Sequence, residues 1–210
     1  VSMVEGIRQT GTTGGVAVGG QTGSAQFAVS ANGILAYVER NQLGLSRTLV
    51  WVERQGKETP IPLPARNYAY PNIAPDGKRV ALDIRDEGQD VWVLELDSLN
   101  LRKLTFDPAP DIAPFWTPDG RRIASFRSGQ GMFVQSADGT GSAERLSESG
   151  TNPVAPRGFV ANPDRLVFDE NTTLGWSVKE LDLQSRKVRD LVAPANANAM
   201  NAALSPDRRW

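Results

Sequence analysis

The chain has 210 residues, of which 40% are hydrophobic, and its 23 basic residues nearly balance 24 acidic ones. Without a basic stripe, nucleic acid is excluded as an expected partner, and no apolar run approaches the roughly 20 residues that membrane insertion needs. The absence of histidine and cysteine excludes a Ser-His-Asp triad, a Cys-His pair, a thiolate or histidine zinc site and any disulfide.

Short predicted strands follow one another along the chain, and no segment has the period of a helix. Residues 1–5 are predicted as an outer strand, and the glycine-rich stretch up to residue 24 as a flexible connection. Four groups of four strands come next, predicted at 26–30, 34–38, 48–52 and 59–63, at 70–74, 79–83, 91–96 and 101–105, at 115–117, 122–126, 132–135 and 144–146, and at 158–160, 165–168, 176–181 and 187–191. A last inner strand is predicted at 203–205.

The dipeptide Pro-Asp returns at a nearly fixed interval. It begins at residues 75, 118, 163 and 206, which are 43, 45 and 43 positions apart. A period of about 40–45 residues is the length of one four-stranded propeller blade. We therefore predict an all-β propeller with four complete blades and partial blades at two truncated ends. The predicted divisions are a remnant and connection at 1–24, blade 1 at 25–66, blade 2 at 67–108, blade 3 at 109–150, blade 4 at 151–194 and the start of a truncated blade at 195–210.

The repeated motif also carries a family resemblance. The pattern Pro-x-x-(Ala/Thr)-Pro-Asp-Gly-(Lys/Arg)-Arg-(Ile/Val)-Ala occurs at 71–81 and 114–124, and it resembles the TolB-type, WD-like propeller repeat over about residues 25–210. Residues 47–56 resemble propeller regions attached to bacterial serine/threonine kinases, although no kinase motif is present. The resemblance implies an interaction module in a periplasmic or other extracytoplasmic location. The fourth repeat, 163–165, departs from the pattern because it lacks the glycine.

Two recurring sets of residues are interpreted as structural. The turn carboxylates are expected to accept hydrogen bonds from their own turns rather than to form a site; they are Asp76, Asp119, Asp164 and Asp207. The aromatic residues on strands are expected to pack between blades; they are Trp51, Trp92, Trp116, Trp176 and Phe133.

The candidate site consists of polar residues just upstream of the inner strands, because inner strands and the loops that lead into them line a propeller's channel. The binding candidates are Asn67, Tyr68 and Arg157. Carboxylate and amide oxygens are the ligands that Ca²⁺ prefers. The metal candidates are Asp111, Asn152, Asn198 and Asn201, and Asn196 belongs to the same set of upstream polar residues. The alternative for all of them is an ordinary solvated loop surface.

Two functions from different classes remain open. The first is a non-catalytic module that presents its loops to a protein or peptide. The second is a hydrolase in which a divalent cation such as Ca²⁺ polarises an activated ester, lactone or phosphotriester and a carboxylate activates water. Asp111 is the candidate catalytic residue, because it is the only carboxylate placed immediately before a predicted inner strand.

The truncated ends predict self-association. An inner strand without its hairpin partner and an uncovered blade face leave backbone donors and apolar surface in water. We expect a homodimer in which the terminal segments and the open side of blade 1 or blade 4 meet across a two-fold axis. The alternative is a single ring that residues 1–5 and 203–205 close within one chain.

Overall fold

The structure is a computed structural model that describes residues 27–29, 35–38, 46–53, 55–147, 152, 154–160, 165–193 and 198–205. Every regular element in these ranges is a β-strand, and the strands form four antiparallel sheets of four. The predicted all-β fold with four complete blades is therefore confirmed. No helix able to cross a membrane occurs in the described part of the chain.

Each blade is a meander of four consecutive strands, ordered from the inner to the outer edge as they occur in the chain. The strands are β1 (Phe27–Val29), β2 (Leu35–Val38), β3 (Leu49–Val52) and β4 (Glu58–Pro60) in blade 1, β5 (Tyr68–Ile73), β6 (Arg79–Ile84), β7 (Asp90–Glu95) and β8 (Asn100–Lys103) in blade 2, β9 (Asp111–Trp116), β10 (Arg122–Arg127), β11 (Gly131–Ser136) and β12 (Glu144–Arg145) in blade 3, and β13 (Val154–Phe159), β14 (Arg165–Thr172), β15 (Gly175–Asp182) and β16 (Val188–Val192) in blade 4.

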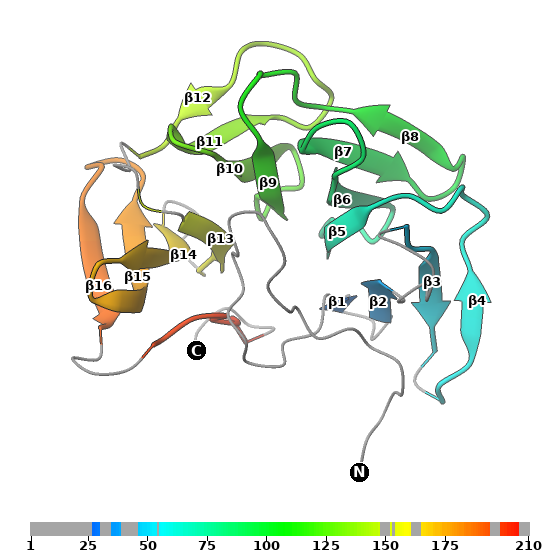
Figure 1. Ribbon diagram of the computed structural model, residues 1–210, viewed down its shortest axis with the longest axis horizontal. Helices are drawn as coiled ribbons and strands as arrows, with labels where there is room; N and C mark the ends of the chain where they lie inside the picture. Colours follow the sequence, from blue (N-terminus) through cyan, green and yellow to red (C-terminus); the bar gives the residue numbers. More distant parts are fainter. Residues whose placement is uncertain are drawn as a thin grey trace.

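The blades stand side by side in an arc, with β1, β5, β9 and β13 toward the middle and β4, β8, β12 and β16 at the rim (Figure 1). Each inner strand packs against the preceding blade: β5 contacts β1 and β2, β9 contacts β5 and β6, and β13 contacts β9 and β10. Residues far apart in sequence thereby meet at the centre of the arc.

The inner strands begin two to four residues earlier than predicted, at Tyr68, Asp111 and Val154. The reason is a bulge within each of them, where the pairing register shifts. The bulge places a left-handed residue five positions before the proline of each turn, namely Tyr70 (φ 48°), Ala113 (φ 53°) and Gly158 (φ 153°). A bulge breaks the alternation of buried and exposed residues, so the sequence pattern is readable only after it.

The Pro-Asp turns have the predicted chemistry where the structure describes them. Asp76 Oδ1 accepts a hydrogen bond from the backbone N–H of Lys78 at 2.8 Å. Asp119 Oδ1 accepts from the N–H of Arg121 at 3.0 Å and from the hydroxyl of Thr117 at 2.6 Å. The glycines after these aspartates have φ values of 70° and 66°, which side chains disfavour. The structural interpretation is confirmed for these two turns, and Asp164 and Asp207 lie outside the described residues.

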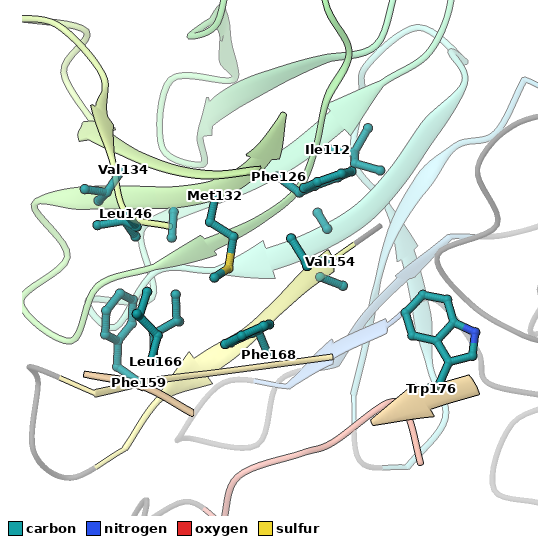
Figure 2. Close-up of a cluster of buried hydrophobic side chains, with 14 residues drawn as sticks. Ile112, Phe126, Met132, Val134, Leu146, Val154, Phe159, Leu166, Phe168 and Trp176 are labelled. Atoms are coloured by element: carbon teal, nitrogen blue, oxygen red, sulfur yellow. The ribbon is translucent and has the colours of Figure 1, made fainter. Parts of the chain in front are cut away.

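Apolar side chains of neighbouring blades form the core. Figure 2 shows the cluster between blades 3 and 4, in which Met132 of one sheet points toward Phe168 of the next. Trp116 and Trp176 are buried in such clusters, and Trp51 and Trp92 pack partly buried against a third. The predicted packing role of the tryptophans is confirmed. Phe133 is half-buried, and the guanidinium of Arg127 lies 4.3 Å from its ring centre.

Polar side chains tie each blade to its neighbour through main-chain oxygens. Gln135 of blade 3 donates to the carbonyl of Leu104 in blade 2 at 2.9 Å. Arg186 of blade 4 donates to the carbonyl of Leu146 in blade 3 at 3.1 Å. In the other direction, Arg102 donates to the carbonyl of Ala137 at 2.6 Å. These bonds satisfy carbonyls at the blade ends.

The segments beyond the four blades are only partly described. Residues 1–24, predicted as a strand remnant and a connection, lie outside the described residues. Residues 198–205 are described but contain no strand, so the strand predicted at 203–205 is wrong. Asn201 nevertheless has the left-handed φ of 59° that the inner strands have five residues before their turns. The segment thus repeats an inner-strand backbone feature without a described second strand to pair with.

Candidate functional site

Two equivalent aspartates lie on the second strands of blades 2 and 4, opposite the inner strands. Asp83 on β6 pairs with Ala69 of β5, and Asp169 on β14 pairs with Ala155 of β13 at the corresponding register. Both side chains are fully buried. A buried carboxylate needs a counter-charge, and each has an arginine close by.

The arginines approach one oxygen of each aspartate. Asp83 Oδ2 accepts from Arg85 Nε at 2.8 Å. Asp169 Oδ2 accepts from Arg157 Nε at 2.6 Å and from the backbone N–H of Asn201, also at 2.6 Å. The remaining oxygens, Asp83 Oδ1 and Asp169 Oδ1, are buried and have no hydrogen-bond partner among the described residues. Each is therefore an acceptor that suits a donor such as an internal water.

Tyr70 lies within electrostatic reach of both ion pairs. The guanidinium of Arg85 is 5.3 Å from its ring centre. Burial raises the pKa of Tyr70, the charge of Asp83 raises it further, and Arg85 and Arg157 oppose the rise. Burial likewise raises the pKa of both aspartates against the effect of their arginines. The centre of the arc is thus a charge-paired network that contains Arg157, one of the predicted binding residues.

Asp111, the candidate catalytic residue, is not in a loop before a strand but is the first residue of β9, and it is fully buried. Arg127 Nε lies 3.2 Å from its Oδ1, and Arg127 Nη2 lies 3.1 Å from its Oδ2. Arg127 Nη1 also contacts Asp107 Oδ2 at 2.9 Å. Burial raises the pKa of Asp111, and the hydrogen bond and charge of Arg127 oppose the rise. Both oxygens of this carboxylate are contacted by Arg127, so the group is paired with an arginine and not positioned to activate a water nucleophile.

The other two binding candidates hold the backbone. Asn67 Oδ1 accepts from Arg47 Nη1 at 3.0 Å, and its Nδ2 donates to the carbonyl of Arg85 at 3.1 Å. Tyr68 is fully buried at the start of β5, and its hydroxyl donates to the carbonyl of Pro64 at 2.8 Å. Both residues fix the start of blade 2, and Tyr68 presents no surface to a ligand.

The asparagines chosen as metal ligands contact blade 4, whereas Asp111 is paired within blade 3. Asn152 donates to Glu170 at 3.2 Å. Asn198 Oδ1 accepts from the N–H of Trp176 at 2.9 Å, and Asn201 Oδ1 accepts from Arg157 at 3.1 Å. Asn196 lies outside the described residues. The described part of the chain holds no group of three His, Cys, Asp or Glu residues that could bind a metal. The Ca²⁺ site stays a prediction.

A pocket of about 310 Å³ lies between blades 2 and 3, on the side where the inner strands begin. It is lined by Arg85, Asp86, Gly88 and Gln89 between β6 and β7, by Asp90 at the start of β7, and by 107–110, which lead into β9. Two of its carboxylates are paired with cations: Asp86 with Arg66, between β4 and β5, at 2.7 Å, and Asp90 with Lys103 of β8 at 2.7 Å. In the described part of the chain, the pocket is a hollow near the inner strands that could take a ligand.

Sequence reasoning missed the buried ion pairs, although one signal was present. Asp83 and Asp169 each stand four residues after the arginine that begins the second strand, Arg79 or Arg165, with three apolar residues between. A charge that recurs at one repeat position on an apolar strand indicates a buried polar network rather than a solvated surface. No comparable signal linked Asp111 to Arg127, which are 16 positions apart.

Comparison with known proteins supplies the family. The TolB beta propeller domain matches residues 27–209. The Tol-Pal system protein TolB of Anaeromyxobacter sp. (strain K) is 42% identical over 73 residues, which cover 33% of this chain and 17% of that protein. The matched segment thus spans less than a fifth of the curated relative.

Solved structures agree on the fold. A TolB of Agrobacterium tumefaciens superposes with a TM-score of 0.69 at 25% identity, over 87% of this chain and 70% of that one. TolB of Acinetobacter baumannii superposes with a TM-score of 0.69 at 20% identity, over 88% of this chain and 46% of that one. Because the family match covers most of the sequence, this chain belongs to the TolB beta propeller domain family.

Proposed function

We propose that this chain is a protein-binding propeller, which presents the side where its inner strands begin to a partner protein. The observation that carries the proposal is the state of the buried carboxylates. Asp83, Asp111 and Asp169 are each paired with an arginine inside the fold, so their geometry favours a fixed scaffold over an exposed catalytic group. No observation specifically favours the hydrolase alternative.

The name of the curated relative suggests the partner. That relative is a Tol-Pal system protein. We therefore propose that the partner is a Pal protein, or a protein of the same kind, and that the chain works in an extracytoplasmic compartment, as the family resemblance implies.

The proposal is tested by isothermal titration calorimetry with purified Pal of Anaeromyxobacter sp. (strain K). We expect saturable heat with this chain, as with the TolB of the same organism used as the reference. Substitution of residues on the opposite side of the propeller, such as Asp97→Asn in the turn between β7 and β8, should leave the heat unchanged. Binding by the reference TolB without binding by this folded chain would refute the Pal assignment.

A further inference from the structure

Phe106 is a large apolar side chain left in solvent beside the pocket between blades 2 and 3. Its side chain is 74% exposed, although Leu104 and Thr105 just before it are buried. The ammonium of Lys103 lies 5.3 Å from its ring centre, and the same ammonium is paired with Asp90 of the pocket wall. Phe106 directly precedes Asp107, which also lines the pocket. The ring is therefore linked to the pocket wall through Lys103 and lies beside the pocket rather than in its lining.

The pocket wall carries an excess of negative charge. Asp86, Asp90 and Asp107 line it together with one cation, Arg85, and that arginine is already paired with the buried Asp83. Arg66 and Lys103 neutralise Asp86 and Asp90 from outside the wall. Arg127, by contrast, is shared between Asp107 and Asp111. Asp107 on the pocket wall thus shares its paired cation with a second carboxylate, and a low-dielectric cleft focuses such incompletely balanced charge toward its opening.

The two walls of the pocket are fixed to each other. The backbone N–H of Asp111 donates to the carbonyl of Gln89 at 2.7 Å, which joins the segment before β9 to the turn before β7. Asp107 Oδ1 accepts from the N–H of Ala109 at 2.9 Å. Pro108 and Pro110 restrict the backbone of this wall further. A preformed pocket lowers the ordering cost of binding.

We propose that this pocket binds a lysine or arginine side chain of the partner protein, while an apolar residue next to it in the partner packs on Phe106. The inference rests on the proposed protein-binding function and specifies its chemistry. A cationic side chain complements the excess carboxylate, its aliphatic stem suits the cleft, and an exposed aromatic ring is a common anchor at interfaces. A protein partner can supply a charged and an apolar group at once, which a free ion cannot.

The test uses two blocked tripeptides, acetyl-Leu-Arg-Leu-amide and acetyl-Leu-Gln-Leu-amide, titrated into the isotopically labelled chain and followed by nuclear magnetic resonance. We expect the arginine peptide to shift the amide signals of Gln89, Asp107, Ala109 and Asp111, and the glutamine peptide to bind at least about threefold more weakly, since a partly exposed charge pair contributes modestly to binding. Raising the salt concentration should weaken the arginine peptide selectively.

Variants separate the two parts of the site. Asp107→Asn should weaken the arginine peptide about threefold to tenfold and leave the glutamine peptide unchanged, and Phe106→Ala should weaken both peptides. Asp90→Asn replaces Asp107→Asn if the latter lowers the thermal unfolding midpoint. The controls are Asp97→Asn, an exposed carboxylate elsewhere, and Leu174→Ala, an exposed apolar residue of blade 4. Equal affinity for the two peptides, or indifference to both test variants, would overturn the inference.

The outcome also distinguishes this inference from the proposed function. If Pal binds the chain and its affinity is unaffected by Asp107→Asn and Phe106→Ala, the protein-binding function stands and the pocket assignment fails. If the arginine peptide binds as expected but Pal does not, the pocket assignment stands and the Pal assignment fails. Binding of guanidinium chloride as tightly as the peptide, with no effect of Phe106→Ala, would show a simple cation pocket and would also overturn the inference.

Discussion

Blades 2 and 3 end in a buried leucine, whereas blade 4 ends in an exposed one. Leu104 and Leu146 are each 4% exposed, and Leu191 at the corresponding end of blade 4 is 42% exposed. The two buried leucines have a following blade that donates a hydrogen bond to their carbonyls, from Gln135 and Arg186. Every residue of β16 is exposed. Among the described residues, the same local sequence pattern therefore yields core where a following blade packs against it and surface at β16, which no described blade follows.

The largest expected difference in stability between blade 3 and the exposed outer strand of blade 4 concerns their arginines. Arg127 of blade 3 has an 11% exposed side chain and pairs with two carboxylates, whereas Arg189 of β16 is 61% exposed and pairs with Glu180. Arg127→Met should lower the free energy of unfolding by about 3–5 kcal/mol, because it leaves a buried charge without a partner. Arg189→Met should cost about 0–1 kcal/mol. Urea unfolding measures both, and similar losses would remove the distinction.

The leucines test the same comparison without charge. Leu104→Ala and Leu146→Ala should each lower the free energy of unfolding by about 2–5 kcal/mol, because each removes buried methyl groups and leaves a cavity. Leu191→Ala should cost about 0.5 kcal/mol, as expected for a surface site. A loss at Leu191 as large as that at Leu104 would mean that the open side of blade 4 is covered in solution.

Buried and turn aspartates should respond to pH in opposite directions. Burial raises the folded-state pKa of Asp83 and Asp169 above the ordinary value of 3.8, so the stability they contribute is greatest below that pH and declines as pH rises through the folded pKa. The Thr117 hydroxyl, the Arg121 N–H and nearby arginines lower the pKa of Asp119, whose contribution is present above pH 3.8 and is lost as pH falls through its folded pKa.

Unfolding of matched variants between pH 3 and pH 7 checks these signs. The stability of Asp169→Asn relative to the unsubstituted chain should improve as pH rises, and that of Asp119→Asn should worsen. Asp138 gives an independent check, because the hydroxyls of Thr140 and Ser136 lower its pKa to about 2, a value that carboxyl chemical shifts report directly. Parallel pH dependences for the two variants would contradict the assignment of the buried pairs.

The homodimer predicted from the sequence is a weaker effect that depends on the open side of blade 4. Three apolar residues of β16 are exposed by 42–51%: Val188, Leu191 and Val192. We expect light scattering to give about twice the chain mass of 22.7 kDa at high protein concentration, and Leu191→Glu to restore the single mass. A single mass at all concentrations would contradict the prediction.

Calcium should have the smallest effect. The asparagines chosen as ligands use their amides within blade 4, and Asp111 is closed by Arg127 in blade 3. We therefore expect no rise in the thermal unfolding midpoint when Ca²⁺ is added to chelator-treated protein. A rise of about 2–4 °C would correspond to roughly 1 kcal/mol of added stability from Ca²⁺ binding and would support the predicted metal site.

The fold was predictable because its signals are local and repeated. The turn at Asp76 and Gly77 can be read from four residues, and its recurrence predicts the blades. The inner-strand starts were not predictable in the same way, because the bulge at Tyr70 or Ala113 interrupts the alternation. The site was less accessible still. The pairing of Asp111 with Arg127 depends on the register of β9 with β10, which no short pattern encodes.

The bonds between blades also bear on how such a chain can arise by duplication. Gln135, Arg186 and Arg102 each reach across to a main-chain carbonyl, and Arg186 also pairs with the carboxylate of Glu144. Every residue offers that carbonyl, so the accepting blade can change its side chains while the contact persists. A copied blade therefore finds an acceptor on its neighbour at once, without a matching substitution there. Repeats joined in this way can drift apart in sequence and still stack.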